Sequence, residues 1–370
     1  MEFTIHRDIL LKSLGHAFGI IEKKTTLPIL SNILIEAKNS RIKITSTDLD
    51  IIYSEEIKIK ELKKEGSTTT SAGILYDILR KLDANSEVEF SLENNKLKLI
   101  SGKSKFNLFC MSSNDFPLSE ENISQKTFEI SSEKMLRLLN KTKISISNDE
   151  TRHYLNGIYL HKVNIENKPF LCSVATDSHR LSLCSIELKE NINIESIILP
   201  KKTIFQLISL LEQSNKTIKI SSNKSRIKFE LGRGILISKV IDGRFPDYNK
   251  VIPKDNNKIL EIKLNEFKNS IDRVTTVSAD RKEGLKISIS KDAIQLSVNS
   301  LNSGEGVESI DGKFNSDNLT ISFNSRYLID IASQIESEKI FIYLKDPGSP
   351  VLVKDPAEKN SFHVVMPMKI

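Results

Sequence analysis

The residues best suited to chemistry form one short run, Thr-Asp-Ser-His-Arg at 176–180, directly after an alternating apolar segment at 170–175. His179 could act as a general base oriented by Asp177 if a nucleophile and a pocket lay beside it. The sequence supplies neither, and the run is more typical of a turn or of the edge of a binding groove. GxxxxGK[ST], GxGxxG, HExxH and GxSxG motifs and paired Cys/His ligand spacings are also missing. Catalysis is therefore the less favoured interpretation, and neither a cofactor nor a metal is expected.

Two other stretches carry residue types suited to binding. Arg152, His153 and Tyr154 form a basic and aromatic cluster in a loop at 148–156, where they could contact a nucleic-acid backbone or stack on bases. A plain surface loop would have the same composition. The C-terminal run Val364–Met368 is apolar, although chain ends are usually polar. It is either a final strand packed in the core or one wall of an adaptable apolar groove, which the flexible thioether of methionine suits.

The bulk composition is that of a globular protein, with 39% hydrophobic and 28% charged residues among 370. No segment approaches the roughly 18 apolar residues of a membrane span, and the N-terminus does not resemble a signal peptide. Cys110, Cys172 and Cys184 lack CxxC spacing, so we expect reduced, structural thiols and a cytoplasmic protein without a membrane partner.

The net charge of +6 is unevenly distributed along the chain. Residues 1–125 carry 17 Lys and Arg against 18 Asp and Glu, and residues 254–370 carry 16 against 17. The middle third carries 21 against 13, which gives it a net charge of +8. This excess is consistent with a nucleic-acid partner, and it is equally consistent with compositional drift in a lysine-rich sequence.

The chain reads as three copies of one unit. An apolar residue followed by proline recurs at 116–117, 245–246 and 366–367, at intervals of 129 and 121 residues, each time after an alternating segment. Within each third, the periodicity predicts two βαβββ halves, which pair into a compact two-layer α+β domain. We therefore predict three similar domains at 1–125, 126–253 and 254–370. Internal repeats of this kind usually build an extended binding surface rather than a single catalytic pocket.

The six predicted helices hold most of the excess positive charge. They lie at 6–18, 73–83, 131–143, 200–212, 263–274 and 325–336, and their formal charges sum to +5. If they share one layer, that layer is mildly cationic. Such a surface suits a phosphate backbone that is read by charge and without sequence preference.

Five short motifs resemble a known family. The segments 26–32 (TLPILSN), 154–157 (YLNG), 175–181 (ATDSHRL), 242–248 (DGRFPDY) and 364–368 (VVMPM) are similar, in order and over the full length, to the bacterial DNA polymerase III beta subunit, the sliding clamp. The resemblance implies a head-to-tail homodimer, with six domains in a closed ring, helices inside and sheets outside. It implies a non-catalytic processivity factor that encircles double-stranded DNA and tethers the replicative polymerase alpha subunit. Further implied partners are the clamp-loader ATPase complex, other polymerases and mismatch-repair factors.

The resemblance also implies a partner groove between the second and third domains. Its ligand would be a short peptide with a glutamine and aliphatic or aromatic anchors. The residues carried over to this groove are Leu155, Thr176, His179, Arg180, Leu181, Pro246, Lys250, Val251, Asn324, Tyr327, Val364, Val365, Met366, Pro367 and Met368.

Two further surfaces follow from the same resemblance. Phe106 and Val277 are implied for the two faces of the subunit contact. Contact with DNA is implied for Lys24, Arg152, His153 and Tyr154.

The sequence departs from the family pattern at three positions near the groove. Ser178 stands where the family often has glycine, which bears on the turn before His179. Lys250 replaces a common arginine, so a planar stacking group is lost. Lys282 falls near an aromatic position of some relatives. Without the resemblance, two alternatives to a DNA clamp stay open: an enzyme that uses Asp177 and His179, and a repeat-built scaffold that binds no nucleic acid.

Overall fold

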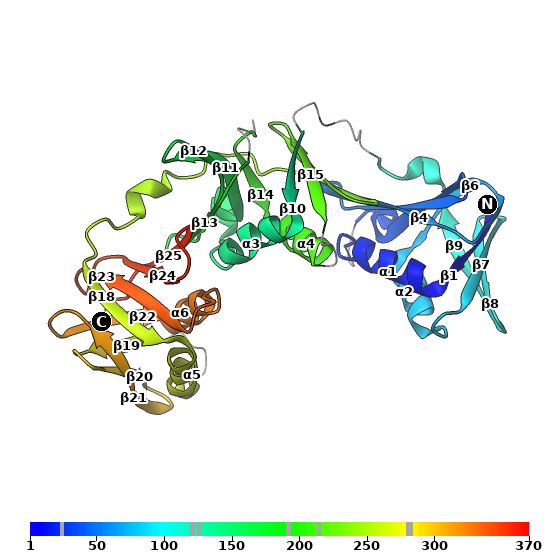
Figure 1. The fold of residues 1–370 in the computed structure, drawn as a ribbon. Helices are drawn as coiled ribbons and strands as arrows, with labels where there is room; N and C mark the ends of the chain where they lie inside the picture. Colours follow the sequence, from blue (N-terminus) through cyan, green and yellow to red (C-terminus); the bar gives the residue numbers. More distant parts are fainter. Residues whose placement is uncertain are drawn as a thin grey trace. The chain divides into compact units, whose positions relative to one another are not determined.

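The computed structural model describes residues 1–22, 26–118, 123, 127–189, 194–212, 216–278 and 284–369. They form two compact units. Unit 1 comprises Met1–Leu136 and Lys202–Val240, and unit 2 comprises Arg137–Lys201 and Ile241–Ile370. Each unit contains one continuous antiparallel sheet with helices packed against it (Figure 1).

Unit 1 contains a sheet of thirteen strands within the described residues, in the order β10-β15-β16-β17-β4-β3-β2-β6-β9-β8-β7-β1-β5. Its strands alternate buried apolar and exposed polar side chains, as antiparallel sheets with one solvated face do. The strands are β1 (Glu2–His6), β2 (Asn32–Lys38), β3 (Arg41–Thr47), β4 (Ile51–Lys58), β5 (Glu61–Lys64), β6 (Gly66–Ser71), β7 (Glu87–Glu93), β8 (Lys96–Ser101), β9 (Ser104–Met111), β10 (Thr127–Ser131), β15 (Thr217–Ser222), β16 (Arg226–Leu231) and β17 (Gly234–Lys239).

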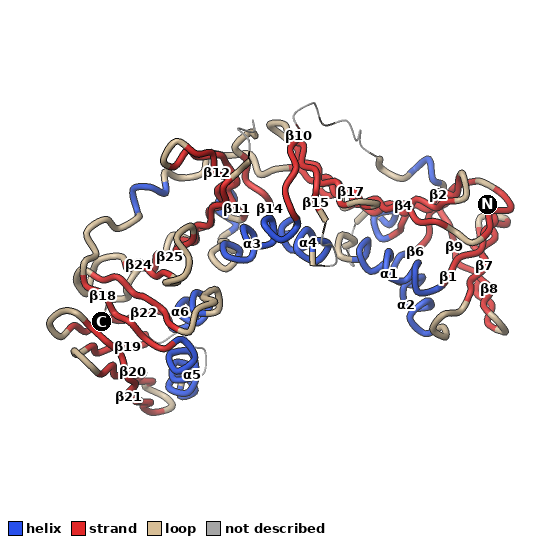
Figure 2. Tube along the Cα trace, in the orientation of Figure 1, coloured by secondary structure: helices blue, strands red, loops and turns tan. Residues whose placement is uncertain are grey.

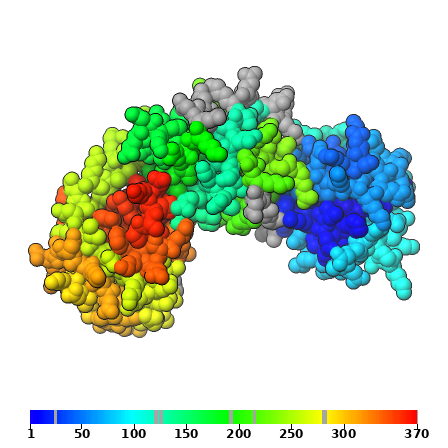
Figure 3. Space-filling model, in the orientation of Figure 1, coloured from blue at the N-terminus to red at the C-terminus, as the bar shows by residue number. Residues whose placement is uncertain are grey.

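Unit 2 contains a sheet of twelve strands, again counted over the described residues, in the order β14-β11-β12-β13-β25-β24-β23-β18-β21-β20-β19-β22. The C-terminal segment, red in Figure 3, lies at the surface beside green atoms of the central third, with which it pairs. The strands are β11 (Gly157–Ile165), β12 (Lys168–Thr176), β13 (Arg180–Glu187), β14 (Ile197–Pro200), β18 (Lys258–Lys263), β19 (Gly284–Ile289), β20 (Ala293–Ser300), β21 (Gly304–Phe314), β22 (Leu319–Asn324), β23 (Lys339–Leu344), β24 (Val351–Lys354) and β25 (Ser361–Val365).

The helices present one apolar stripe each to the sheets. In the helix at 264–274, Phe267, Ile271 and Val274 are almost fully buried at spacings of three and four residues, which places them on one face. Figure 2 shows the first two helices side by side on one face of their strands, and the last two likewise. The helices are α1 (Arg7–Phe18), α2 (Ala72–Lys81), α3 (Ser132–Lys143), α4 (Lys201–Leu211), α5 (Leu264–Val274) and α6 (Ser325–Ala332).

The element order repeats the βαβββ plan six times in the described chain, as the sequence predicts. One strand, β5, lies outside the plan and forms the edge of the sheet of unit 1 beside β1. Its short, charged sequence gives little apolar alternation to predict it from. The α+β class is therefore confirmed.

The two units do not coincide with the three predicted domains, because two strand pairings cross the predicted boundaries. Residues 234–238 of β17 pair with 51–55 of β4, and residues 180–184 of β13 pair with 361–365 of β25. Each pairing, which we call a seam, makes two neighbouring thirds share one sheet. The division into domains at 125 and 253 therefore stays a prediction.

Candidate binding groove

Unit 2 contains an apolar groove of about 200 Å³. Three segments form it: the turn between β12 and β13, the end of β25, and the linker around the short helix η4 (Tyr248–Val251). The lining residues are Thr176, Ser178, His179, Arg180, Leu181, Pro246, Asp247, Tyr248, Val251, Val364 and Met366.

The turn at 176–180 is held by its own side chains. Asp177 Oδ1 accepts the backbone N–H groups of His179 and Arg180 at 3.0 and 2.9 Å, and Oδ2 accepts the Nε–H of Arg180 at 3.1 Å. Thr176 Oγ1 donates to the carbonyl of Arg180 at 2.7 Å. The Asp177 carboxylate is therefore engaged in shaping the turn, and this argues against its orienting the imidazole of His179 for catalysis.

The base of the groove is apolar because two strands of the seam contribute side chains on the same face. Leu181 and Val364 stand opposite each other, are 2% and 3% exposed, and belong to one cluster with Tyr248. The backbone N–H of Met366 donates to the carbonyl of His179 at 2.8 Å, so the chain end is tied to the turn. Met366 remains 40% exposed at the rim. A flexible apolar side chain over an apolar base suits an aliphatic or aromatic ligand group.

Arg180 connects the groove to α6. Its Nη1–H donates to Asp330 Oδ2 at 2.7 Å, and its guanidinium lies over the ring of Tyr327, 4.3 Å from the centroid. Burial, followed by the nearby charge of Asp177, raises the pKa of Tyr327. Asn324 caps α6 by accepting the backbone N–H of Arg326 at 3.0 Å. Tyr327 of α6 thus lies beside the groove through Arg180, and neither Tyr327 nor Asn324 is among the lining residues.

The linker is fixed by stacked rings beneath η4. Phe245 stacks on Tyr159 at 4.9 Å, and Tyr159 stacks on His161 at 4.3 Å. His161 Nε2 and the hydroxyl of Tyr248 form a hydrogen bond of 2.9 Å. Burial lowers the pKa of His161 to about 4, so this ring is neutral at neutral pH. The aromatic stack holds Pro246 and Val251 in place as a groove wall.

Most residues carried over by resemblance gather here, and some have other positions. Leu155 is buried in the cluster at the base, whereas Val365 is fully buried in the C-terminal core because successive strand residues face opposite sides. The side chain of Lys250 is 81% exposed and lies 3.6 Å from Asp247. Pro367 is half-buried, and Met368, which follows it, forms a bridge with Ser322 of β22.

The residue list from the sequence omits three lining residues: Ser178, Asp247 and Tyr248. All three fall inside motifs that carry the family resemblance, at 175–181 and 242–248. Membership of these two motifs is therefore the sequence signal that marks all three residues as candidates for the groove wall. Lys282 lies outside the described residues.

The candidate DNA contacts lie beside the same turn. Arg152 donates through Nε to Asp149 at 2.8 Å and through Nη1 to the hydroxyl of Ser178 at 2.6 Å. His153 Nε2 lies 3.2 Å from the carbonyl of Asp242, and its ring meets that of Tyr154 edge-on at 5.8 Å. These side chains are thus close to one another. Lys24 lies outside the described residues.

The candidate subunit-contact residues lie at separate places. Phe106 is half-buried on β9 in unit 1, opposite Leu99 of β8. Val277 is half-buried after α5 in unit 2, where it packs against the C-terminal core. Neither lines the groove.

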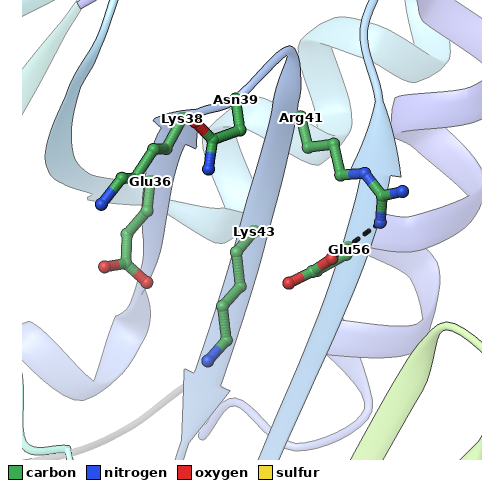
Figure 4. Close-up of a pocket in the computed structure, with 6 residues that line it drawn as sticks. All are labelled: Glu36, Lys38, Asn39, Arg41, Lys43 and Glu56. Atoms are coloured by element: carbon green, nitrogen blue, oxygen red, sulfur yellow. Dashed lines mark hydrogen bonds and ion pairs between the residues drawn. The ribbon is translucent and has the colours of Figure 1, made fainter.

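A second hollow, in unit 1, has a different character. It holds about 400 Å³ over the solvent face of β2, β3 and β4. Arg41 Nη1 donates to Glu56 Oε2 at 3.0 Å, and charged side chains dominate its walls (Figure 4). An open, charged sheet surface provides no apolar anchor for a peptide. Its residues are Glu36, Lys38, Asn39, Arg41, Lys43 and Glu56.

Within the described residues, no helix is long and apolar enough to cross a membrane, and no group of three or more His, Cys, Asp or Glu side chains could hold a metal ion. Cys110, Cys172 and Cys184 are free thiols. Burial raises the pKa of Cys172 and of Cys184 to about 12, so both stay protonated and unreactive at neutral pH.

Comparisons with known proteins give a consistent family. Models of the N-terminal, central and C-terminal domains of the DNA polymerase III beta subunit match residues 1–120, 129–247 and 249–369. A beta sliding clamp of Caulobacter vibrioides is 37% identical over 373 residues, and one of Escherichia coli is 30% identical over 370, each covering 100% of both chains. A sliding clamp from Bartonella birtlesii, solved bound to griselimycin, is 36% identical with a TM-score of 0.97 over 100% of both chains.

The fold is therefore that of a DNA sliding clamp, a class of non-catalytic processivity subunits. The chain belongs to the bacterial DNA polymerase III beta subunit family. As a sliding clamp it acts on DNA together with a polymerase.

Proposed function

We propose that two copies of this chain close head to tail into a ring around double-stranded DNA. Each copy would contribute three domains, at 1–125, 126–253 and 254–370, with helices toward the DNA and sheets outside. The single observation that supports this best is the pattern of strand seams. The last strand of each βαβββ half is an edge that needs a partner, because an exposed strand edge promotes uncontrolled pairing.

Four of these six last strands already pair. β4 pairs with β17, and β13 pairs with β25. In the described chain, residues 104–108 of β9 pair only with β8, and residues 304–311 of β21 pair only with β20. A second copy arranged head to tail would offer β21 to β9 and β9 to β21. Two further seams of the same kind would then close the ring, with no strand edge left to extend it.

The side chains on these two edges are complementary. Phe109 on β9 is 83% exposed and Val307 on β21 is 52% exposed, which leaves apolar surface for the contact. The exposed Lys105 of β9 can face the exposed Glu305 of β21. Phe106 and Val277 would lie on the two faces of this contact.

Light scattering tests the dimer directly. We expect the mass of two chains for the natural protein and of one chain for Phe106→Asp, because a buried, unpaired carboxylate in the contact is costly. Phe205→Asp, at an exposed position of α4, is the matched control and should stay dimeric. A monomeric natural protein at micromolar concentration would contradict the ring.

Enclosure explains how the protein can stay on DNA without gripping it. The six segments predicted as helices from the sequence carry a formal charge of +5 of the total +6, enough to attract phosphates weakly. Contacts from Lys24, Arg152, His153 and Tyr154 would be to the backbone, because base-specific contacts would fix a register and stop sliding. A tethered polymerase then gains a high effective concentration at the primer end.

The groove is the proposed docking site for these partners. Its apolar base and polar rim suit a short peptide with a glutamine and aliphatic or aromatic anchors. Such peptides would come from the replicative polymerase alpha subunit, the clamp-loader ATPase complex, other polymerases and mismatch-repair factors, one at a time. Because these partners act on the chromosome, we place the protein in the cytoplasm. A pulldown with each partner should succeed with the natural protein and fail with Leu181→Asp.

A further inference from the structure

A single guanidinium connects the candidate DNA loop to the groove. Arg152 lies in the short helix η3 (Glu150–Leu155), and its Nη1–H donates to the hydroxyl of Ser178 at 2.6 Å. Ser178 lines the groove. The same loop contacts the linker, where His153 Nε2 lies 3.2 Å from the carbonyl of Asp242. The loop that carries Arg152 therefore contacts one lining residue of the groove, Ser178, and the segment at Asp242 that leads to its linker wall.

The hydrogen bonds of Arg152 decide which edge of its guanidinium a phosphate can take. Nε is bonded to Asp149 Oδ2 at 2.8 Å. Asp149 Oδ1 is itself anchored by the backbone N–H and the hydroxyl of Thr151, at 2.9 and 2.6 Å. A phosphate prefers two parallel N–H donors on one edge of the fork. Because Asp149 is charged and anchored, the edge that is easier to release is the one where Nη1 meets the neutral Ser178.

Ser178 can lose its hydrogen bond to Arg152 while its backbone stays in position. Its backbone N–H donates to Thr176 Oγ1 at 3.1 Å, and the turn is held by Asp177 independently of the serine hydroxyl. The backbone of Ser178 has φ = 76°, a conformation that favours glycine. A residue with a side chain is therefore strained here. Because the turn does not depend on the serine hydroxyl, rotation about χ1 can move that hydroxyl away from Arg152 without unfolding the turn.

We infer that Ser178 is a positioning residue whose hydroxyl is exchanged between Arg152 and the partner, so that phosphate capture by Arg152 strengthens binding in the groove. This inference rests on the proposed function of groove and loop. A released hydroxyl adds one neutral hydrogen bond to the ligand, which corresponds to about a 2- to 10-fold gain in affinity. By reciprocity, a filled groove strengthens the phosphate contact by the same factor.

A cycle of variants tests the exchange without DNA. The probe is a fluorescein-labelled pentapeptide with an N-terminal glutamine, leucines and a C-terminal phenylalanine, and its dissociation constant is measured by anisotropy. Arg152→Ala should tighten binding about 2- to 10-fold, because it releases Ser178 as a phosphate would. Ser178→Ala should not tighten it, and the double variant should match Ser178→Ala. If Arg152→Ala weakens binding or leaves it unchanged, Arg152 merely braces the loop and the inference is overturned.

The second arm adds a saturating 24-base-pair duplex. The natural protein should bind the peptide about 2- to 10-fold more tightly with DNA than without, and Arg152→Ala should lose this gain. Ser178→Gly relieves the backbone strain and removes the hydroxyl, so it should lose the gain as Ser178→Ala does. A gain that survives in either serine variant contradicts the exchange. If the natural protein binds DNA but not the peptide, both the groove assignment and the coupling are contradicted. If the variants change peptide affinity as expected but DNA has no effect on it, only the DNA role of Arg152 is contradicted.

Discussion

The turn at 47–51 in unit 1 and the turn at 176–180 in unit 2 have nearly the same backbone geometry and different surroundings. In each, an aspartate accepts the backbone N–H groups two and three residues further on: 3.0 and 2.7 Å for Asp48, and 3.0 and 2.9 Å for Asp177. In each, a threonine hydroxyl donates to the carbonyl four residues on, at 2.9 Å for Thr47 and 2.7 Å for Thr176. The middle residues have φ angles of 77° and 76°.

The strands beyond the turns also correspond. The backbone N–H of Lys239 donates to the carbonyl of Asp50 at 2.8 Å, just as that of Met366 donates to His179 at 2.8 Å. In unit 1, the Lys239 ammonium pairs with the Asp50 carboxylate at 2.9 Å. In unit 2, the corresponding pair is a thioether and an imidazole at the rim of the groove.

The comparison teaches that the turn is a scaffold and that the residues around it decide its use. Where an ion pair joins the turn to the neighbouring strand, as in unit 1, the rim is polar. Where methionine and histidine occupy the same positions, the apolar base is accessible. The Thr-Asp run that first suggested catalysis is thus a repeated structural element, and one of its two copies lines an apolar groove.

Removing the chain end should have the largest effect. Deletion of residues 366–370 removes the rim of the groove and the backbone bond from Met366 to His179. We expect polymerase stimulation in a primer-extension assay to be abolished, with the dimer mass unchanged in light scattering. Lys239→Ala, which alters the corresponding position of unit 1, is the control and should stimulate normally. A truncated protein that still stimulates the polymerase would contradict the assignment of the groove as a docking site.

A fall in pH should destabilise the seam of unit 2 more than the seam of unit 1. At the position of Leu236 in the seam of unit 1, the seam of unit 2 has His363, whose Nδ1 is 2.7 Å from the hydroxyl of Ser182. Burial, together with Lys141 and Arg180, lowers the pKa of His363 to about 3.

The sign of the pH effect follows from this lowered pKa. Below about pH 6.5 the unfolded chain takes up a proton that the folded chain refuses, so stability is complete above that pH and is lost as pH falls toward 3. Between pH 7.5 and 5, His363 should cost about 2 kcal/mol of unfolding free energy, measured by urea denaturation. His363→Leu should remove this part of the pH dependence, and an unchanged dependence would place the protonation elsewhere.

Breaking the turns should separate their structural role from binding. Asp48→Ala and Asp177→Ala each leave two backbone N–H groups without their acceptor, and each should lower the unfolding free energy by about 1–3 kcal/mol. Only Asp177→Ala should also weaken peptide binding, by about tenfold or more. Asn variants, which keep one oxygen acceptor, should be milder. Equal loss of peptide affinity in Asp48→Ala would show that the two turns do not differ in use.

The smallest effect should come from the ion pair of unit 1. Lys239→Met introduces the residue type that Met366 has at the corresponding position of unit 2. It also removes an exposed ion pair, whose side chains are 51% and 70% exposed. The unfolding free energy should change by less than about 1 kcal/mol, and isothermal titration should still give one peptide per chain. A second bound peptide would mean that Lys239 alone prevents the turn of unit 1 from binding a peptide.

Local pattern was enough to predict the helices and the sixfold βαβββ order, because apolar periodicity is a property of neighbouring residues. The seams were not predictable in this way, since the pairing of β17 with β4 joins residues that are far apart in sequence. The facing of Val365 also depends on register, which no motif specifies. The duplicate turn was visible as Thr47-Asp48 and Thr176-Asp177, yet only hydrogen-bond geometry shows that the two copies are equivalent.

The central claim, that the protein holds DNA by enclosing it, is tested most directly by retention on circular and linear DNA. The protein is loaded by its clamp loader on nicked circular plasmid and passed through a gel-filtration column in moderate salt. We predict that it elutes with the circle, and that a single restriction cut releases it while the DNA mass is unchanged. Protein that stays on cut DNA with free ends, or that leaves the intact circle in the same salt, would contradict enclosure.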